Sequence, residues 1–155
     1  CLQQMVEAFE ETQGNMVAAM EVPDERTKSY GILDVKDDFG RCVSTKGMVE
    51  KPEPGTAPSN LAVIGRYILT PTVLQKLDKH QAGAGGEIQL TDAIDAARVD
   101  GDEVYGFKFE GQRFDCGSKA GFLQASVAFA LARDDLRDEL WSYISDVVHA
   151  DKAAQ

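Results

Sequence analysis

The sequence has too few cysteines and histidines to build a disulfide framework or a zinc cluster. Three of its 155 residues are cysteine and two are histidine. Cys1, Cys42 and Cys116 are odd in number and widely spaced, which argues against a disulfide scaffold and against a paired-cysteine metal motif. His80 and His149 lie among charged residues near expected helix ends, as solvated surface histidines do. This cysteine usage fits a reducing compartment, and we expect a cytoplasmic protein.

Long apolar runs and positive charge are also scarce. No segment approaches the ~20 apolar residues that cross a bilayer, and none resembles a signal peptide. Lysine and arginine total 16 against 26 aspartates and glutamates, a formal net charge of −10. An acidic surface disfavours nucleic acid and anionic membranes as partners. A phosphate ligand stays open, because one lysine or a bound metal ion can reverse the potential inside a cleft.

The most informative stretch is 47–67, which reads GMVEKPEPGTAPSNLAVIGRY. A hydrophobic strand ends there on an adjacent acid and base, Glu50 and Lys51. Pro52 follows them and stops the strand, because proline lacks a backbone donor. The two charges are thus delivered at a strand end. On a regular strand they cannot point the same way, so at least one role depends on local twist.

A second strand begins in the same stretch, after a loop rich in proline and glycine. Residues 61–64 are apolar on both faces, which indicates a buried strand, and Gly65 marks a bulge or a close approach to the backbone. Asn60 leads into it. Buried strands with polar ends are where α/β proteins bind their ligands.

Hydrophobic periodicity and capping residues predict helices and strands that alternate loosely. Strands are expected at 15–22, 30–35, 42–50, 61–69 and 103–110. Helices are expected from Leu2 to a stop at Gly14, from Pro71 with Thr70 as N-cap, over 92–98 with Thr91 as N-cap, over 122–131, and over 138–148. Residues 23–29 are expected to form a charged loop and residues 150–155 a disordered tail.

Four segments carry a resemblance to a known family. They are VEKP, PSNLAVIGRYIL, GAGGEIQLTDAI and FEGQRFDCGSKAGFLQA, in this order along the chain. Together they resemble the bacterial UTP–glucose-1-phosphate uridylyltransferases, also called UDP-glucose pyrophosphorylases. VEKP alone indicates only the broad superfamily of sugar nucleotidyltransferases. The GGEIQLTDAI and FDCG segments together make the resemblance specific to the uridylyltransferases.

The resemblance implies a fold and a place within it. The fold is α/β, a portion of a nucleotidyltransferase Rossmann-like fold with a mixed sheet flanked by helices. Residues 1–155 would form its carboxy-terminal, sugar-binding half. The absent amino-terminal half would supply the glycine-rich nucleotide loop and one metal-binding aspartate. This chain is therefore expected to be inactive alone.

The implied reaction is uridylyl transfer from UTP to glucose 1-phosphate, which gives UDP-glucose and pyrophosphate. The attacking phosphate oxygen is already anionic, so positioning and charge neutralisation dominate the chemistry. Lys51 is the expected catalytic residue, because its ammonium can neutralise the sugar phosphate. Glu50 is expected to bind substrate by accepting hydrogen bonds from sugar hydroxyls. Without the resemblance, the two would be an ordinary exposed pair.

The resemblance adds three further substrate-binding positions. Gly31, in a Tyr-Gly pair, would lie over the sugar, the backbone of Val63 would contact it, and the side chain of Asn60 would complete the site. The alternatives are a strand bulge for Gly31 and a loop hydrogen bond for Asn60. Glu87 is a further candidate for contacting substrate or bracing Lys51, with a structural role as its alternative.

Asp115 matches the second metal-binding aspartate of the resembled family. A carboxylate is a ligand that Mg²⁺ prefers, with phosphate oxygens and waters at the other positions. The alternative is that Asp115 caps the following helix, and both roles are compatible. Cys116 is expected to pack rather than to act as a nucleophile, because this transfer needs no covalent intermediate.

Other readings and partners follow from the same residues. The chain could instead be a non-catalytic module that binds a sugar phosphate or assembles with a partner, or it could use another nucleotide or sugar. The expected partners are UTP, glucose 1-phosphate and further copies of the chain. The helical tail 137–155 is the candidate subunit contact, through an apolar face that includes Trp141.

Overall fold

The structure is a computed structural model that describes residues 1–53, 55–78 and 89–153. It divides into two compact units, the barrel unit (residues 1–111) and the helical unit (residues 112–155). The barrel unit contains α1 (Leu2–Thr12), β1 (Asn15–Glu21), the 3₁₀ helix η1 (Asp24–Ser29), β2 (Gly31–Asp38), β3 (Cys42–Glu50), β4 (Leu61–Ile68), α2 (Pro71–Asp78), α3 (Leu90–Val99) and β5 (Val104–Lys108). The helical unit contains α4 (Lys119–Leu131) and α5 (Asp134–Ala153).

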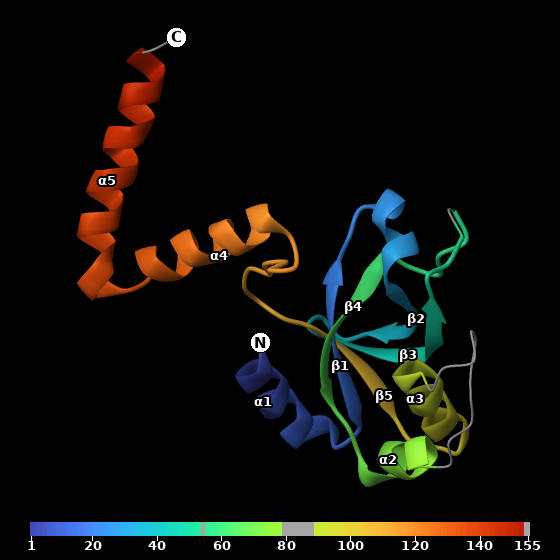
Figure 1. Ribbon diagram of the computed structural model, residues 1–155. Helices are drawn as coiled ribbons and strands as arrows, with labels where there is room; N and C mark the ends of the chain where they lie inside the picture. Colours follow the sequence, from blue (N-terminus) through green and yellow to red (C-terminus); the bar gives the residue numbers. More distant parts are fainter. Residues whose placement is uncertain (54, 79–88, 154–155) are drawn as a thin grey trace. The chain divides into compact units, whose positions relative to one another are not determined.

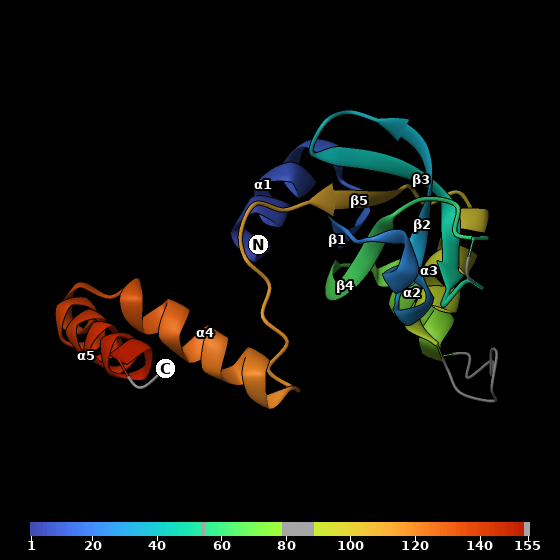
Figure 2. The same cartoon turned by 90° about the horizontal axis from the view of Figure 1, so that it is seen from above.

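The five strands form one sheet in the order β1-β4-β2-β3-β5, which closes on itself as a barrel. β1 and β5 are parallel, and the other neighbouring pairs are antiparallel. Figures 1 and 2 show the strands of the barrel unit gathered into this sheet, with α1, α2 and α3 beside it. The predicted mixed sheet flanked by helices is confirmed. Closure was not predicted, and it leaves none of the five strands with an open edge.

Side chains fill the inside of the barrel. A Cβ added at Gly106 on β5 would collide with Leu33 of β2 and lie 2.9 Å from Cγ2 of Val43 on β3. Leu33 and Val43 are fully buried. Three strands therefore approach each other so closely that only glycine fits at this position.

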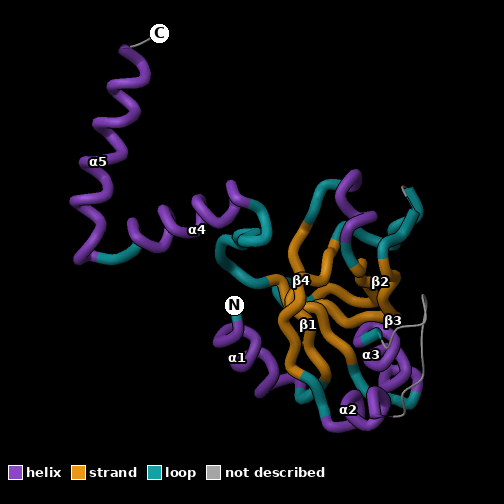
Figure 3. Tube along the Cα trace, in the orientation of Figure 1, coloured by secondary structure: helices purple, strands orange, loops and turns teal. Residues whose placement is uncertain are grey.

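Helices cover two parts of this sheet. Met5 of α1 is fully buried against Met16 of β1. α2 and α3 lie beside each other at one end of the strands (Figure 3) and bring Val73 and Ile94 into the cluster that contains Leu33. Apolar burial on both sides of the strands provides the main stabilisation of this unit.

A buried polar network ties the ends of three elements together. Asn15 at the start of β1 is fully buried, and its Oδ1 accepts the backbone N–H of Thr70 at 2.7 Å. Asn15 Nδ2 donates to Asp102 Oδ2 at 3.2 Å, and the Thr70 hydroxyl donates to the same oxygen at 2.9 Å. α2 begins at Pro71 as predicted. The Thr70 hydroxyl, however, donates to Asp102 just before β5.

Two predicted helix ends are wrong by one or more residues. α3 begins at Leu90 with Gln89 as its N-cap, so Thr91 lies inside the first turn. α1 ends at Thr12 because Gln13 takes the left-handed conformation, with φ of 55°. Gly14 has a different reason to be glycine: a Cβ there would lie 2.7 Å from Cε2 of Tyr105.

Two segments predicted to be irregular are helical. The charged stretch after β1 forms η1, in which Thr27 is buried and its hydroxyl donates to the Asp24 carbonyl at 2.7 Å. The tail is helical through Ala153, as the end of α5. Within the ranges that the structure describes, no helix is long and apolar enough to cross a membrane.

Candidate functional site

Three neighbouring strands place predicted site residues in one row. Gly31 at the start of β2 pairs with Glu50 at the end of β3. On its other side β2 pairs with β4, where Ile32 is opposite Ala62. One residue further along, this antiparallel register brings Val63 level with Gly31. Glu50, Gly31 and Val63 therefore lie side by side at one end of β2.

Lys51 joins this row because its backbone leaves the strand conformation. Its φ is +47°, and its N–H donates to the Tyr30 carbonyl at 3.0 Å. A regular strand would direct Glu50 and Lys51 to opposite faces. The left-handed residue breaks that alternation, and Lys51 Nζ lies 3.6 Å from Glu50 Oε1. The local twist that would let both side chains reach one site is therefore present, and it lies in the backbone of Lys51 itself.

The ion pair is open to a ligand. The side chains of Lys51 and Glu50 are 65% and 45% exposed. Such an exposed pair adds little stability, because solvent screens it and two long side chains lose freedom. Its two charges are held close together while each keeps hydrogen-bonding capacity for a third group.

The Glu50 carboxylate lies directly against the backbone of Gly31. A Cβ at this position would be 3.0 Å from Glu50 Oε2 and 4.0 Å from Cγ2 of Thr91. Gly31 itself is buried. Any side chain here would push the carboxylate away, and the first turn of α3 brings Thr91 to the same place. Thr91 is therefore a wall residue that sequence reasoning had assigned only to helix capping.

Tyr67 is a second residue that sequence reasoning missed. It pairs with Val17 as Val63 pairs with Ala19, so Tyr67 and Val63 share a face despite the β-bulge between them. Burial raises the pKa of Tyr67, and the nearby charge of Glu50 raises it further. The phenol therefore stays neutral beside the carboxylate. The bulge contains Gly65, with φ of +72°, which confirms the bulge interpretation of that glycine.

Asn60 is not brought into this row. Asn60 lies three residues before Val63, roughly 10 Å along the strand. Its backbone carbonyl accepts the N–H of Val22 at 3.0 Å. Glu87 belongs to 79–88, outside the residues that the structure describes. Both sugar-binding roles stay predictions.

Asp115 lies in the helical unit, in a tight turn before α4. Its Oδ1 accepts the N–H of Gly117 at 3.1 Å, and its carbonyl accepts the N–H of Ser118 at 3.2 Å. Ser118 is the N-cap: its Oγ accepts the N–H of Gly121 at 3.0 Å. The alternative role for Asp115, capping of this helix, is therefore wrong. A Cβ at Gly121 would collide with the Asp115 carbonyl, so glycine is required where the turn meets the helix.

Metal ligands are sparse in the part of the chain that the structure describes. Within it, no three side chains of histidine, cysteine, aspartate or glutamate come together as a metal site. Asp115 is exposed, and its Oδ2 accepts no hydrogen bond that the structure records. In phosphate-transfer sites, one or two carboxylates bind Mg²⁺ together with phosphate oxygens and waters. This donor set fits Mg²⁺ only in a site of that kind.

The row of Glu50, Gly31 and Val63 lies within a matched family region. The family described as nucleotidyl transferase matches residues 1–131. The chain belongs to the nucleotidyl transferase family. The fold prediction and the assignment to this superfamily are thereby confirmed.

Named relatives of this nucleotidyl transferase are uridylyltransferases. It is 46% identical over 143 residues to UTP–glucose-1-phosphate uridylyltransferase 2 of Staphylococcus saprophyticus, covering 92% of this chain and 49% of that protein. It is 56% identical over 119 residues to UTP–glucose-1-phosphate uridylyltransferase of Komagataeibacter xylinus, covering 77% of this chain and 42% of that protein.

A solved structure of UDP-glucose pyrophosphorylase complexed with UDP-glucose superimposes with a TM-score of 0.75. It is 39% identical and covers 85% of this chain and 50% of that chain. The predicted resemblance is confirmed by these similarities. The nucleotidyl transferase chain spans about half the length of the curated relatives that it matches.

Proposed function

We propose that this chain carries the sugar-phosphate site of an enzyme that transfers a uridylyl group from UTP to glucose 1-phosphate. The products are UDP-glucose and pyrophosphate. The observation that carries this proposal is the Glu50–Lys51 pair, held at a strand end beside Gly31 by a left-handed backbone. The names of the relatives support the choice of uridine and glucose.

In this proposal the residues act by binding and charge neutralisation. The Lys51 ammonium binds the phosphate of glucose 1-phosphate and stabilises the negative charge that gathers as its oxygen attacks the α-phosphorus of UTP. Glu50 accepts hydrogen bonds from the sugar hydroxyls. The backbone at Gly31 and Val63 lies level with Glu50 and completes the sugar site, with Thr91 and Tyr67 as its walls. The phosphate nucleophile needs no general base.

Mg²⁺ is the proposed cofactor, with Asp115 as one of its ligands. When bound, the ion neutralises charge on the triphosphate. The Asp115 carboxylate is held by its bond to the Gly117 N–H, which leaves its other oxygen for a cation. Asn60 is retained as a weaker candidate for sugar binding, because the register sets it apart from the row.

The proposal is tested by replacing the matching half of the S. saprophyticus relative with this chain and measuring Mg²⁺-dependent pyrophosphate release. Lys51→Ala should lower turnover by ~10²-fold or more, the effect of removing a group that stabilises charge in the transition state. Lys36→Ala is the matched control, because Lys36 is an exposed lysine on β2. Equal rates for the two variants would exclude Lys51 from the mechanism.

A second measurement separates an enzyme half from a binding module. The 155-residue chain alone should bind glucose 1-phosphate, with shifts at the amides of Gly31 and Lys51, and should release no pyrophosphate with UTP. Binding by the chain without turnover in the chimaera would favour the non-catalytic module. Turnover by the chain alone would contradict the proposed division of the site.

We also propose that copies of the chain associate through the helical unit and that the protein acts in the cytoplasm. Trp141 and Tyr143 of α5 are 62% and 66% exposed, which is unusual for large aromatic side chains. Light scattering should give an oligomer that Trp141→Glu weakens, and a monomer in both cases would contradict this.

The three cysteines are unpaired, which suits a reducing compartment such as the proposed cytoplasm.

A further inference from the structure

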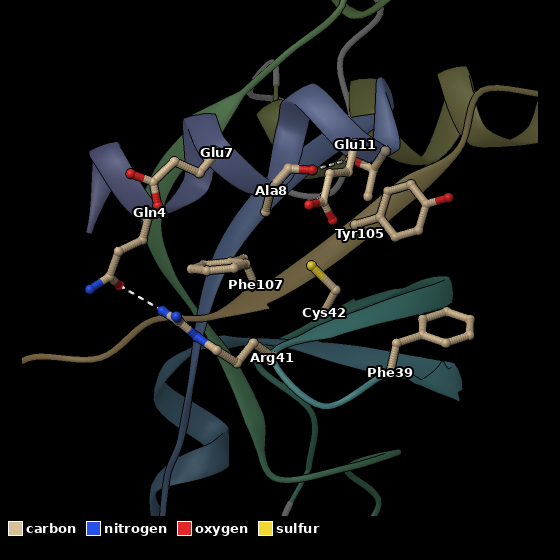
Figure 4. Close-up of a pocket in the computed structure, with 10 residues that line it drawn as sticks. Gln4, Glu7, Ala8, Glu11, Phe39, Arg41, Cys42, Tyr105 and Phe107 are labelled. Carbon is tan, nitrogen blue, oxygen red and sulfur yellow. Dashed lines mark hydrogen bonds between the residues drawn. The ribbon is translucent and has the colours of Figure 1, made fainter.

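The two ends of β3 have different surroundings. Cys42, at the start of the strand, lines a cavity of about 660 Å³ that residues of α1 and β5 also line (Figure 4). Towards its other end β3 packs against α3, the helix whose first turn brings Thr91 to the proposed sugar site. The position of α3 on β3 therefore affects the geometry of that site.

Two glycines on neighbouring strands lie next to α3. Gly31 of β2 and Gly47 of β3 are three residue pairs apart along the β2–β3 ladder. A Cβ at Gly31 would be 4.0 Å from Cγ2 of Thr91. A Cβ at Gly47 would be 3.2 Å from Oδ1 of Asp95. The same helix therefore passes both glycines at contact distance.

Helix geometry agrees with this arrangement. Thr91, Asp95 and Arg98 follow one another at intervals of four and three residues, so they share one face of α3. The rise along a helix over the seven residues from Thr91 to Arg98 is roughly 10 Å. Three steps along a strand, the separation of the two glycines, also cover roughly 10 Å. α3 can therefore run alongside the two strands with Thr91 at one glycine and Asp95 and Arg98 at the other.

The Asp95 carboxylate is fixed where it meets β3. Its Oδ1 accepts a hydrogen bond from Nε of Arg98 at 2.8 Å, and the same oxygen is the atom nearest to a Cβ at Gly47. Nε and Nη2 of Arg98 lie 3.9 Å from that Cβ position. An ion pair of this kind adds little stability by itself, because solvent screens it. Here it holds the carboxylate in one place against the backbone of β3.

We propose that Asp95 is a positioning residue for the sugar-phosphate site. Held by Arg98, it lies against Gly47 and sets how closely α3 approaches β3. This spacing determines how far Thr91 stands from the Glu50 carboxylate. Asp95 acts through Thr91 and not by contact with the sugar. The inference rests on the proposed function, since it takes Thr91 as a wall of that site.

The kinetic test uses the chimaera with the S. saprophyticus relative. Asp95→Ala should raise the KM for glucose 1-phosphate about threefold and leave kcat and the KM for UTP unchanged, the pattern expected when a binding contact is weakened. Asp95→Asn keeps the size of the side chain and should restore the KM of the parent chimaera. Asp92→Ala is the matched control, because it makes the same truncation at an exposed residue of the same helix. Its KM should be unchanged.

Gly47→Ala tests the same contact from the strand. It places a methyl group against the Asp95 carboxylate and should also raise the KM for glucose 1-phosphate. In the Asp95→Ala background this added effect should largely disappear, because the carboxylate is gone. Backbone strain at Gly47, where φ is +157°, would instead add to the effect of Asp95→Ala. Additive effects would therefore overturn the proposed contact.

Amide chemical shifts of the 155-residue chain without ligand separate this inference from the proposed function. The Gly31 amide should shift in Asp95→Ala and stay in place in Asp92→Ala. An unmoved Gly31 amide in Asp95→Ala would overturn the positioning role, whatever the chimaera does. A shifted amide with an unchanged KM would overturn it too, because α3 would then move without affecting the sugar site. An inactive chimaera would reject the proposed function, and the Gly31 amide would still decide whether Asp95 positions α3.

Discussion

The barrel unit and the helical unit bury their apolar side chains to very different extents. Among the residues that the structure describes, eighteen of the buried core hydrophobics belong to the barrel unit, and one, Ala125, belongs to the helical unit. The helical unit instead exposes Phe122, Leu123, Phe129 and Trp141, each by more than half. The barrel is therefore held by its own core, whereas within their own unit α4 and α5 depend mainly on local helix interactions.

Predicted site residues occur in each of the two units. Glu50 and Lys51 are attached to a closed sheet that has no open edge among its five strands. Asp115 is attached to a turn in the unit with little core. Rigid elements position side chains more precisely than turns do. Within its own unit, Glu50 is therefore expected to be held more rigidly than Asp115 is within the other.

The sharpest test of this difference compares two apolar truncations. Leu33→Ala removes a fully buried side chain from the barrel and should lower the free energy of unfolding by about 2–5 kcal/mol. Phe129→Ala removes a side chain that is 67% exposed and should change it by less than about 0.5 kcal/mol. Urea unfolding followed by amide signals of β1 measures both. Similar losses would mean that the helical unit shares the barrel's core.

A second pair adds a methyl group instead of removing one. Gly106→Ala places a Cβ against Leu33 and Val43 inside the barrel and should cost about 1–3 kcal/mol of global stability. Gly121→Ala places the same group against the Asp115 carbonyl. It should leave the unfolding midpoint of the barrel unchanged and shift only the amides of the turn at 115–118. A lowered barrel midpoint for Gly121→Ala would contradict the independence of the two units.

Local patterns predicted much of the barrel unit. The limits of β3 agree with the predicted strand at 42–50, because Pro52 and the charged pair mark its end. The pairing of Gly31 with Glu50 brings together two residues that were each predicted to contact the sugar. What would collide with a side chain at Gly31 is the Glu50 carboxylate, which no local pattern reveals.

Other features depend on contacts between distant residues. The barrel closes because β3 pairs with β5, where Val43 is opposite Gly106, and no sequence window contains both. Tyr67 approaches Glu50 only through the register of β4 and its bulge. The left-handed φ of Lys51 interrupts the alternation of side chains along the strand. Backbone conformations that go against local preference cluster at functional sites. The roles of Asn60, Glu87 and Asp115 stay predictions.

Cysteine reactivity gives a third contrast, between a half-buried and an exposed thiol. Burial and the charge of Glu11 raise the pKa of Cys42, so less reactive thiolate is present near pH 8. Iodoacetamide should modify Cys42 several-fold more slowly than the exposed Cys116, with a rate that keeps rising at higher pH. Mass spectrometry of timed samples measures both sites. Equal rates at pH 8 would contradict the raised pKa.

The same shift has a consequence for stability. The folded protein holds the Cys42 proton more tightly than the unfolded chain, so this contribution is fully present below the ordinary thiol pKa of 9.0. It is lost as the pH rises through the higher folded-state value. Cys42→Ser should flatten that alkaline decline, and Cys116→Ser should leave it unchanged.

The smallest expected effect tests how α4 is held without a core of its own. Ser118→Ala removes the hydroxyl that accepts the Gly121 N–H, and should cost about 1 kcal/mol of helix stability. Ser126→Ala is the matched control in the same helix. Its hydroxyl donates back to the Phe122 carbonyl, a mid-helix bond that competes with the helix, and alanine has the higher helix propensity. Hydrogen exchange of the α4 amides should be about fivefold faster for Ser118→Ala and no faster for Ser126→Ala. Unchanged exchange in Ser118→Ala would mean that tertiary packing, and not the cap, holds α4.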